Sequence, residues 1–323
     1  MTNVPSRTAF VAVAVCIGMV LALLVLRALE AQWPPLALWA FVLLSLTLGF
    51  GHGALDAVLL LGQFAPRRKA LAVSAAYLLC VLQAGWLLSW SVPVALLLLV
   101  LMSVWHFGEL HRYALWARLC VGGASVMWPM LVAPDEMARL LQGALGSGFA
   151  LAWRGWQVLA YGWLVLLAAC ALGGMVWCVA HREKFASARQ VLESSRLGSA
   201  LWAGLEITAV LCAYFVLSPL LAFTLYFGLY HCLAHVARVR RAVLAQRAPF
   251  LARYTLAFVA SALATAALLA LLWWFLPAVP WGGAVGSVAT DPGQLLQWLV
   301  VALAAVTLPH LLLVSYSARW LGR

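Results

Sequence analysis

Residues 219–237 have the sequence PLLAFTLYFGLYHCLAHVA, a stretch that holds two histidines and no Lys, Arg, Asp or Glu. This length and composition are typical of a transmembrane helix, which needs ~17–25 mostly apolar residues. The other apolar runs of the chain are also long and unbroken. Strands of an outer-membrane barrel would instead alternate apolar and polar residues over short segments. The sequence therefore predicts an all-α fold.

The whole chain has a membrane-protein composition, with 66% hydrophobic and 9% charged residues over 323 positions. We interpret residues 1–323 as one transmembrane domain, a polytopic helix bundle without a soluble domain. The first run is too long for a signal peptide and is followed by no small-residue cleavage site. Breaking the chain at charged and Pro/Gly clusters predicts about ten spans: 9–29, 36–62, 70–90, 93–111, 117–133, 156–180, 200–217, 219–237, 252–276 and 294–316.

The basic residues predict the orientation of these spans. With the N-terminus inside, all but three of the twenty Lys and Arg residues fall on the cytoplasmic side, the exceptions being Arg27, Arg139 and Arg154. This asymmetry follows the positive-inside rule and predicts an even number of spans, with both termini cytoplasmic. The net charge of +11 is spread over short loops, so it does not indicate nucleic-acid binding.

Histidines occur inside three otherwise apolar stretches, GHGALD at 51–56, WHFGE at 105–109 and YHCLAH at 230–235. An ionisable ring is costly in hydrocarbon unless it faces the protein interior and has a partner, and a metal ion best explains several imidazoles together. The three predicted spans all run from outside to inside and carry their histidines at similar depth. We therefore predict that His52, His106, His231 and His235 converge on one metal ion.

Spacing within the third stretch limits the chemistry. His231 and His235 lie at i and i+4, so they share one helix face and can bind one ion. The glutamate of an HExxH zinc protease is absent between them, which argues against a peptidase. An all-imidazole site suits Fe, Zn or Cu, and spacing does not choose among them. Hydrogen-bonded core histidines are the alternative for His52 and His106 taken alone.

Other polar residues are candidates to support the ligands. Asp56 and Glu109 are placed to accept a hydrogen bond from the second N–H of a ligand histidine, or to meet interfacial arginines instead. Glu206 is a supporting acceptor or a buried protonated acid, and His310 is a pocket or supporting residue after Pro309. His111 and His181 fall at predicted cytoplasmic ends, where a solvated ring is expected. The seven cysteines show no CxxC pair, so we interpret them as core residues.

The three histidine patterns together resemble the Brp/Blh-type β-carotene dioxygenases of microbes. They are His52-Gly53 with Asp56, His106-Phe107-Gly108-Glu109, and His231 with His235 after Tyr226-Phe227; Pro129 and Pro309-His310 add to the likeness. The resemblance implies an inner-membrane enzyme that uses O2 to split the central double bond of β-carotene into two molecules of retinal. It also implies Fe(II) on His52, His106, His231 and His235, and a link to a microbial rhodopsin that uses the retinal.

The residues before His231 fit a long apolar substrate dissolved in the bilayer. Phe223 and Phe227 precede His231 at steps of four residues, and Tyr226 with Tyr230 forms an adjoining stripe. We predict that these four aromatic residues line a polyene tunnel beside the metal, although ordinary helix packing would also explain them.

Three other functions remain as alternatives. A membrane metal transporter or permease would be expected to carry more intramembrane carboxylates than Asp56, Glu109 and Glu206. Haem binding is disfavoured because His231 and His235 share one helix face. Di-iron lipid desaturases have more, and more tightly clustered, histidines than this chain. The sequence does not indicate an oligomeric state.

Overall fold

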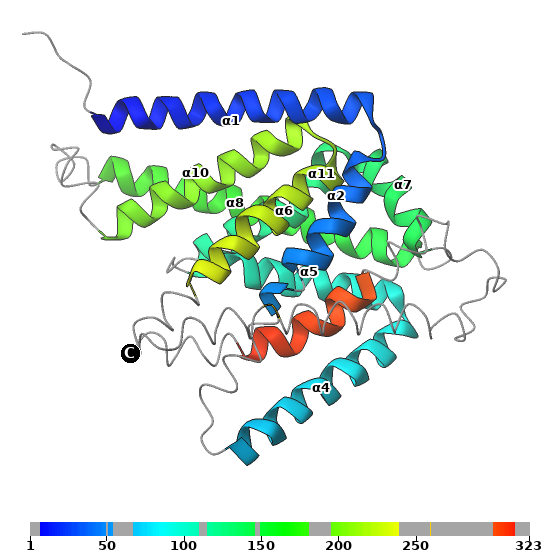
Figure 1. Cartoon of the computed structure of the whole chain (residues 1–323). Coiled ribbons are helices and arrows are strands. Elements are labelled where there is room, and N and C mark those ends of the chain that lie inside the picture. The colour runs from blue at the N-terminus through cyan, green and yellow to red at the C-terminus, as the bar shows by residue number, and fades with distance from the viewer. Residues whose placement is uncertain are drawn as a thin grey trace, which may run out of the picture.

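The computed structural model describes residues 7–49, 51–53, 67–109, 115–145, 149–180, 195–238, 259 and 300–313. Every regular element within these ranges is helical, which confirms the predicted all-α class (Figure 1). The predicted span 252–276 lies outside the described residues apart from position 259. The number of ten spans and the cytoplasmic placement of the termini therefore stay predictions.

The helices follow the predicted apolar runs closely. Their bounds are α1 (Arg7–Gln32), α2 (Leu36–Leu44), η1 (Ser45–Gly49), α4 (Arg67–Ser89), α5 (Val92–Gly108), α6 (Leu115–Val132), α7 (Pro134–Leu145), α8 (Phe149–Ala180), α10 (Ser195–Val216), α11 (Pro219–Thr224) and η4 (Leu225–Cys232). Helix continues from η4 to residue 238, and residues 300–313 form a further helix near the C-terminus.

Several of these helices have the length and composition of membrane spans. Within the described residues, four are long and apolar enough to cross a bilayer: Leu36–Gly53, Leu115–Val132, Trp153–Gly173 and Pro219–Arg238. Shorter apolar helices occupy Ser74–Ser89, Val92–Gly108, Ala203–Val216 and Val300–Leu313. These helices support membrane association.

Two helix boundaries are informative. The predicted break at Ser218-Pro219 is confirmed, because α10 ends at Val216 and α11 begins at Pro219. The Ser218 side chain caps α11 by accepting a hydrogen bond from the backbone N–H of Leu221 at 3.4 Å. In contrast, α8 begins seven residues before the predicted start at 156, because residues 149–156 contain no proline that would stop a helix.

Helix α6 lies at the centre of the described bundle and packs against α5, α8 and α10. Small residues permit this close packing. A Cβ atom on Gly122 would overlap the carbonyl group of Val104 in α5, and one on Gly123 would overlap the indole of Trp163 in α8. The interior formed around α6 positions the site described next.

Two segments of π-helix meet beside this interior. η1 follows α2 directly, η4 follows α11 directly, and the two segments contact each other. A π-helix has widened turns with i→i+5 hydrogen bonds and occurs most often at functional sites. His52 lies shortly after η1 and His231 lies within η4, so the candidate site is built around this contact.

Candidate metal centre

Five histidines from four helical segments gather in the interior. His52 follows η1, His106 lies in the last turn of α5, His231 and His235 lie in and just after η4, and His310 belongs to the helix at 300–313. Each side chain is buried, with at most 6% of its surface exposed. The four histidines predicted as ligands are thus brought together, and a fifth joins them.

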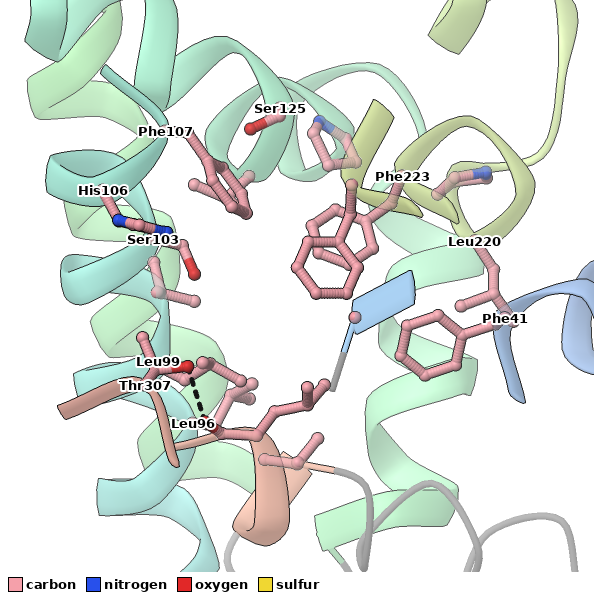
Figure 2. A pocket seen from close by; sticks show the side chains of 18 of the residues that line it. Phe41, Leu96, Leu99, Ser103, His106, Phe107, Ser125, Leu220, Phe223 and Thr307 are labelled. Carbon is pink, nitrogen blue, oxygen red and sulfur yellow. Dashed lines mark hydrogen bonds between the residues drawn. The ribbon is translucent and has the colours of Figure 1, made fainter. Parts of the chain in front are cut away.

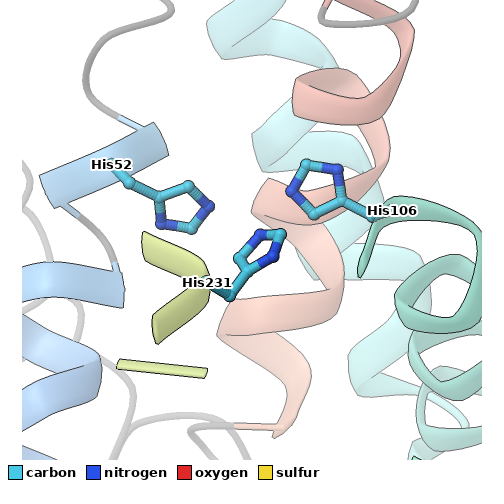
Figure 3. Close-up of side chains that lie close together, drawn as sticks. All are labelled: His52, His106 and His231. Carbon is cyan, nitrogen blue, oxygen red and sulfur yellow. The ribbon is translucent and has the colours of Figure 1, made fainter. Parts of the chain in front are cut away.

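The imidazole rings lie close enough to share an ion. The ring centroid of His106 lies 4.7 Å from that of His231 and 4.8 Å from that of His310. Ring nitrogens fall into two overlapping groups, each with its candidate ligand atoms within 4.8 Å of one another. The first group is His52, His106 and His231, whose rings point toward one another in Figure 3. The second is His106, His235 and His310.

Most of these nitrogens have no hydrogen-bonding partner within the described part of the chain. This holds for Nε2 of His52 and His235, and for both ring nitrogens of His106 and His231. Leaving a buried polar atom unpaired costs roughly 1–3 kcal/mol, so such atoms are rare unless they have another role. Neutral imidazole nitrogens are good ligands for Fe, Zn and Cu. The arrangement is therefore suited to holding a metal ion.

One ring nitrogen at the site has a partner that sequence reasoning missed. Nδ1 of His52 lies 3.3 Å from Sγ of Cys232, and Cys232 is completely buried. A contact at Nδ1 leaves Nε2 of His52 directed elsewhere, which is how outer partners fix the tautomer of a metal-binding histidine. The sequence predicts Asp56 in this role, and Asp56 lies outside the described residues. The adjacency of Cys232 to His231 was the available signal.

Glycines bring the two π-helical segments together. A Cβ atom on Gly49 would lie 2.8 Å from Cε1 of Phe227, and one on Gly228 would lie 2.9 Å from Cβ of Leu44. Both contacts are shorter than real Cβ atoms tolerate. The ring of Phe227 could turn away from a Cβ atom at position 49, but Cβ of Leu44 is fixed to its backbone, so the close approach at Gly228 requires glycine. The close approach places the ring of His52 5.7 Å from that of His231, centroid to centroid.

The helix that carries His106 is fixed in a similar way. A Cβ atom on Gly108 would overlap the backbone of Arg118 in α6. Arg238 also reaches the end of α5, where its Nη1 donates a hydrogen bond of 2.8 Å to the carbonyl oxygen of Glu109. These contacts fix the last turn of α5 and with it the position of His106.

Histidines of the cluster border an apolar cavity. Figure 2 shows Phe41 and Phe223 facing Ser103 and His106 across this cavity. His52 and His310 line it as well. Because the walls are almost entirely hydrocarbon, the cavity suits a nonpolar ligand better than an ion in transit.

The four aromatic residues predicted to line a tunnel divide into two pairs. Phe223 and Phe227 line the cavity, and their rings stack at a centroid distance of 5.7 Å. Tyr226 is buried against Phe107 with ring centroids 5.4 Å apart, while Tyr230 is 41% exposed. Neither tyrosine is among the residues that line the cavity.

The predicted supporting carboxylates lie outside the two groups of nitrogens. Glu109 caps the C-terminal end of α5, and Glu206 on α10 lies near Tyr226. Neither carboxylate belongs to a group that could hold the ion among the described residues. His310, which we had expected in a supporting role, is as close to His106 as a predicted ligand is.

Comparison with known families decides the assignment of the chain. A family model described as beta-carotene 15,15'-dioxygenase matches residues 43–317. The chain belongs to the beta-carotene 15,15'-dioxygenase family. Comparisons with curated proteins and with solved structures find no match. The matched region contains all five histidines of the cluster and every residue that lines the cavity except Phe41.

Membership in the beta-carotene 15,15'-dioxygenase family implies that the chain is a dioxygenase and that β-carotene is its substrate. The histidine groups that could hold a metal ion and the apolar cavity beside them agree with this activity.

Proposed function

We propose that this protein is an inner-membrane enzyme that cleaves the central 15,15' double bond of β-carotene with O2, using Fe(II) held by His52, His106, His231 and His235. One observation carries the proposal. Buried ring nitrogens that lack partners among the described residues converge at the end of an apolar cavity. In the reaction the central C=C bond breaks and each of its carbons takes one oxygen atom, so one carotene and one O2 give two retinals.

The donor set fits ferrous iron. Imidazole is a common ligand of iron, and four neutral imidazoles leave the ion its full positive charge. Iron, when bound, supplies the oxygen chemistry that amino-acid side chains lack. His310 also lies within 5.4 Å of His52, His106 and His235 by ring centroids, so it is the candidate for a further contact to the ion.

The protein orients the substrate and excludes water from the site. Phe223 and Phe227 present a flat aromatic wall beside His231, against which a conjugated chain can lie. The apolar walls exclude water, which protects reactive species from hydrolysis. Holding the substrate with one bond beside the histidines turns an encounter in the bilayer into an oriented reaction. No side chain need act as an acid or base.

The bilayer is the natural source of the substrate. β-Carotene dissolves in hydrocarbon, and the cavity lies among helices that have the composition of membrane spans. A site between such helices takes its ligand from the membrane without passing it through water. In cells that make a microbial rhodopsin, we propose that the retinal supplies its chromophore.

The test combines metal analysis with product analysis. The purified protein is assayed for bound metal, incubated with β-carotene without oxygen, and then exposed to O2. We expect iron in the protein and retinal as the product only after oxygen is admitted. Unequal apocarotenals in place of retinal would refute central cleavage, and metal uptake by vesicles without carotene cleavage would favour a transporter.

A further inference from the structure

The cavity has two unlike ends. Its lining includes His52, His106 and His310, and it also includes Met137 and Leu141 of α7, which are apolar. Met137 and Leu141 are 6% and 3% exposed, so the apolar end is covered by protein. No predicted site residue lies at this end, and neither the metal nor its ligands explains why the cavity extends so far.

Two α-helices give the distance between the two ends. Each helix lines the cavity at a histidine of the cluster and again ten residues earlier in the chain. The pairs are Leu96 with His106 in α5, and Val300 with His310 in the helix at 300–313. At ~1.5 Å per residue of α-helix, the lining extends for ~15 Å from the histidines. The two helices thus wall the cavity along its length.

Helix α7 is positioned at the start of one of these helices, α5. α6 runs antiparallel to α5, because Gly108 lies against Arg118 and Gly122 lies against Val104. The end of α6 therefore returns to the start of α5, and α7 begins at Pro134, two residues after α6 ends. Helix α7 consequently crosses the end of the cavity that is opposite the histidines.

One face of α7 closes that end. Met137, Leu140 and Leu141 are spaced as neighbours on a helix surface, and all three line the cavity. Asp135 and Arg139 on the other side are exposed. An amphipathic helix with one buried face is held in place by that face, so it forms a fixed wall.

A polar contact holds the neighbouring elements. The buried carboxylate of Glu30, at the end of α1, accepts hydrogen bonds from the backbone N–H of Ser218 at 3.1 Å and from its hydroxyl. This contact ties α1 to the start of α11. Helix α7 packs against α6 and α8, so the elements at the closed end of the cavity are held by direct contacts.

Half of a β-carotene molecule matches this depth. From the central double bond to the far edge of its terminal ring there are about nine chain bonds and a ring, ~15 Å at the ~1.2 Å advance per bond of an extended chain. We propose that the cavity is a half-site, in which Met137, Leu140 and Leu141 of α7 stop the terminal ring and so decide which double bond lies beside the histidines. This inference rests on the proposed function.

The proposal predicts opposite shifts for opposite changes at the stop. Leu141→Ala deepens the half-site, so the ring enters further and a double bond more distant from the ring reaches the histidines. Leu141→Trp, or the milder Leu140→Phe, shortens the half-site and brings a bond nearer the ring to the histidines. In each case one C=C bond breaks and each carbon receives one oxygen atom of O2, so only the position of the cut changes.

An apocarotenal with a ring at one end only distinguishes the two directions, because shifts in either direction give the same unequal pair from symmetric β-carotene. We expect retinal from the unmodified protein, a longer ring-bearing fragment from Leu141→Ala, and a shorter one from Leu141→Trp or Leu140→Phe. Leu159→Ala is the matched control, because Leu159 is partly buried on α8 but does not line the cavity. The ratio of products is measured, so a lower yield of folded variant does not affect the result.

Binding of retinal to the metal-free protein gives a readout that needs no reaction. Retinal is half the substrate and should occupy the half-site, so Leu141→Trp should weaken its binding by at least about tenfold. Val158→Trp is the control. Val158 is 71% exposed on α8, so the Val158→Trp variant should bind retinal normally.

The outcomes separate the two proposals. Failure of the unmodified protein to cleave any carotene would overturn the proposed function. Cleavage that stays central in all α7 variants, with unchanged retinal binding, would overturn the stop while leaving the proposed function intact.

Discussion

The interior treats two sets of buried polar groups in opposite ways. Two backbone carbonyls of α6 are paired with side chains of neighbouring helices: the Tyr214 hydroxyl donates to the carbonyl of Ser125, and the Trp156 indole donates to that of Val126 at 2.9 Å. At the histidine cluster, one helix away on α5, both ring nitrogens of His106 have no partner among the described residues.

The pairing around α6 has a clear cause. Pro129 lies inside α6 and has no N–H, so it leaves the carbonyl of Ser125 four residues earlier without its helical partner. Tyr214 of α10 supplies the missing donor. In a membrane such freed backbone groups must find partners within the protein. The fold thus supplies a partner for the carbonyl that Pro129 frees, whereas among the described residues it supplies none for the ring nitrogens of His106.

The largest expected effect separates metal binding from stability. His231→Leu should abolish metal binding, with affinity lowered more than about a hundredfold, since even supporting residues of metal sites cost 10–100-fold. The metal-free protein should be as stable as before or more so, because an unpaired buried polar group is replaced by an apolar one. Metal content and thermal unfolding of the metal-free protein measure the two effects.

His181→Leu is the control for this change. His181 is predicted at the cytoplasmic end of a span, so the His181→Leu variant should retain the metal. If His231→Leu kept its metal, or if the metal-free variant were strongly destabilised, the contrast between the two regions would be lost.

The next effect concerns the contact of the π-helical segments. Gly228→Ala forces a Cβ atom to within 2.9 Å of Cβ of Leu44, so η1 and η4 must move apart and His52 must move away from His231. We expect metal affinity to fall about tenfold or more, as it does when the support of a ligand is lost. Isothermal titration with Fe(II) under anaerobic conditions measures this affinity.

Gly162→Ala is the matched glycine control on α8, where an added Cβ atom meets no described atom within 4 Å. It should leave metal affinity unchanged and stabilise the helix by up to ~1 kcal/mol. Equal affinities for the two alanine variants would show that the close approach does not position the ligands.

A change to a side chain that packs against α6 should lower the stability of the protein without changing its metal affinity, which is the reverse of the result expected for His231→Leu. Trp163 donates its indole N–H to the carbonyls of Leu119 and Cys120, at 3.2 Å each, and does not line the cavity. Trp163→Phe should lower the free energy of unfolding by about 1 kcal/mol through loss of this hydrogen bond, apart from any packing change. Metal affinity should be unchanged, and a loss of metal would place the two regions in one cooperative unit.

The smallest effect is expected at Cys232. Cys232→Ala removes the contact to Nδ1 of His52, and because sulfur is a weak hydrogen-bonding atom the fall in metal affinity should be less than about tenfold. Cys232→Ser keeps a hydrogen-bonding group and should restore most of the affinity. If serine and alanine behaved alike, the contact would be packing only.

The sequence predicted the cluster because the depth of a histidine in a membrane span can be counted from the ends of the span. It also predicted that Phe223 and Phe227 lie on the face of His231, and the stacked rings of these three residues agree with that spacing. It missed the π-helical segments, since their wider turns have no sequence signature that periodicity detects. It missed Cys232 because a buried cysteine among apolar residues is normally only a core residue.

The nearness of His310 to His106 could not be predicted from the sequence for a different reason. A single histidine after a proline carries no spacing to another ligand, so only the packing of the last described helix against α5 shows how near it lies. Likewise, the sequence of α7 contains nothing about the cavity that the helix closes.

The bond between Glu30 and Ser218 bears on how the chain can be shortened. The family match begins at residue 43, so a fragment cut at that boundary would lack α1 and its carboxylate. The fragment would retain every histidine of the cluster, yet the first turn of the helix carrying two of them would lose its tether. The region matched by the family model is therefore shorter than the region that stabilises the site, and expression work should retain the N-terminal helix α1.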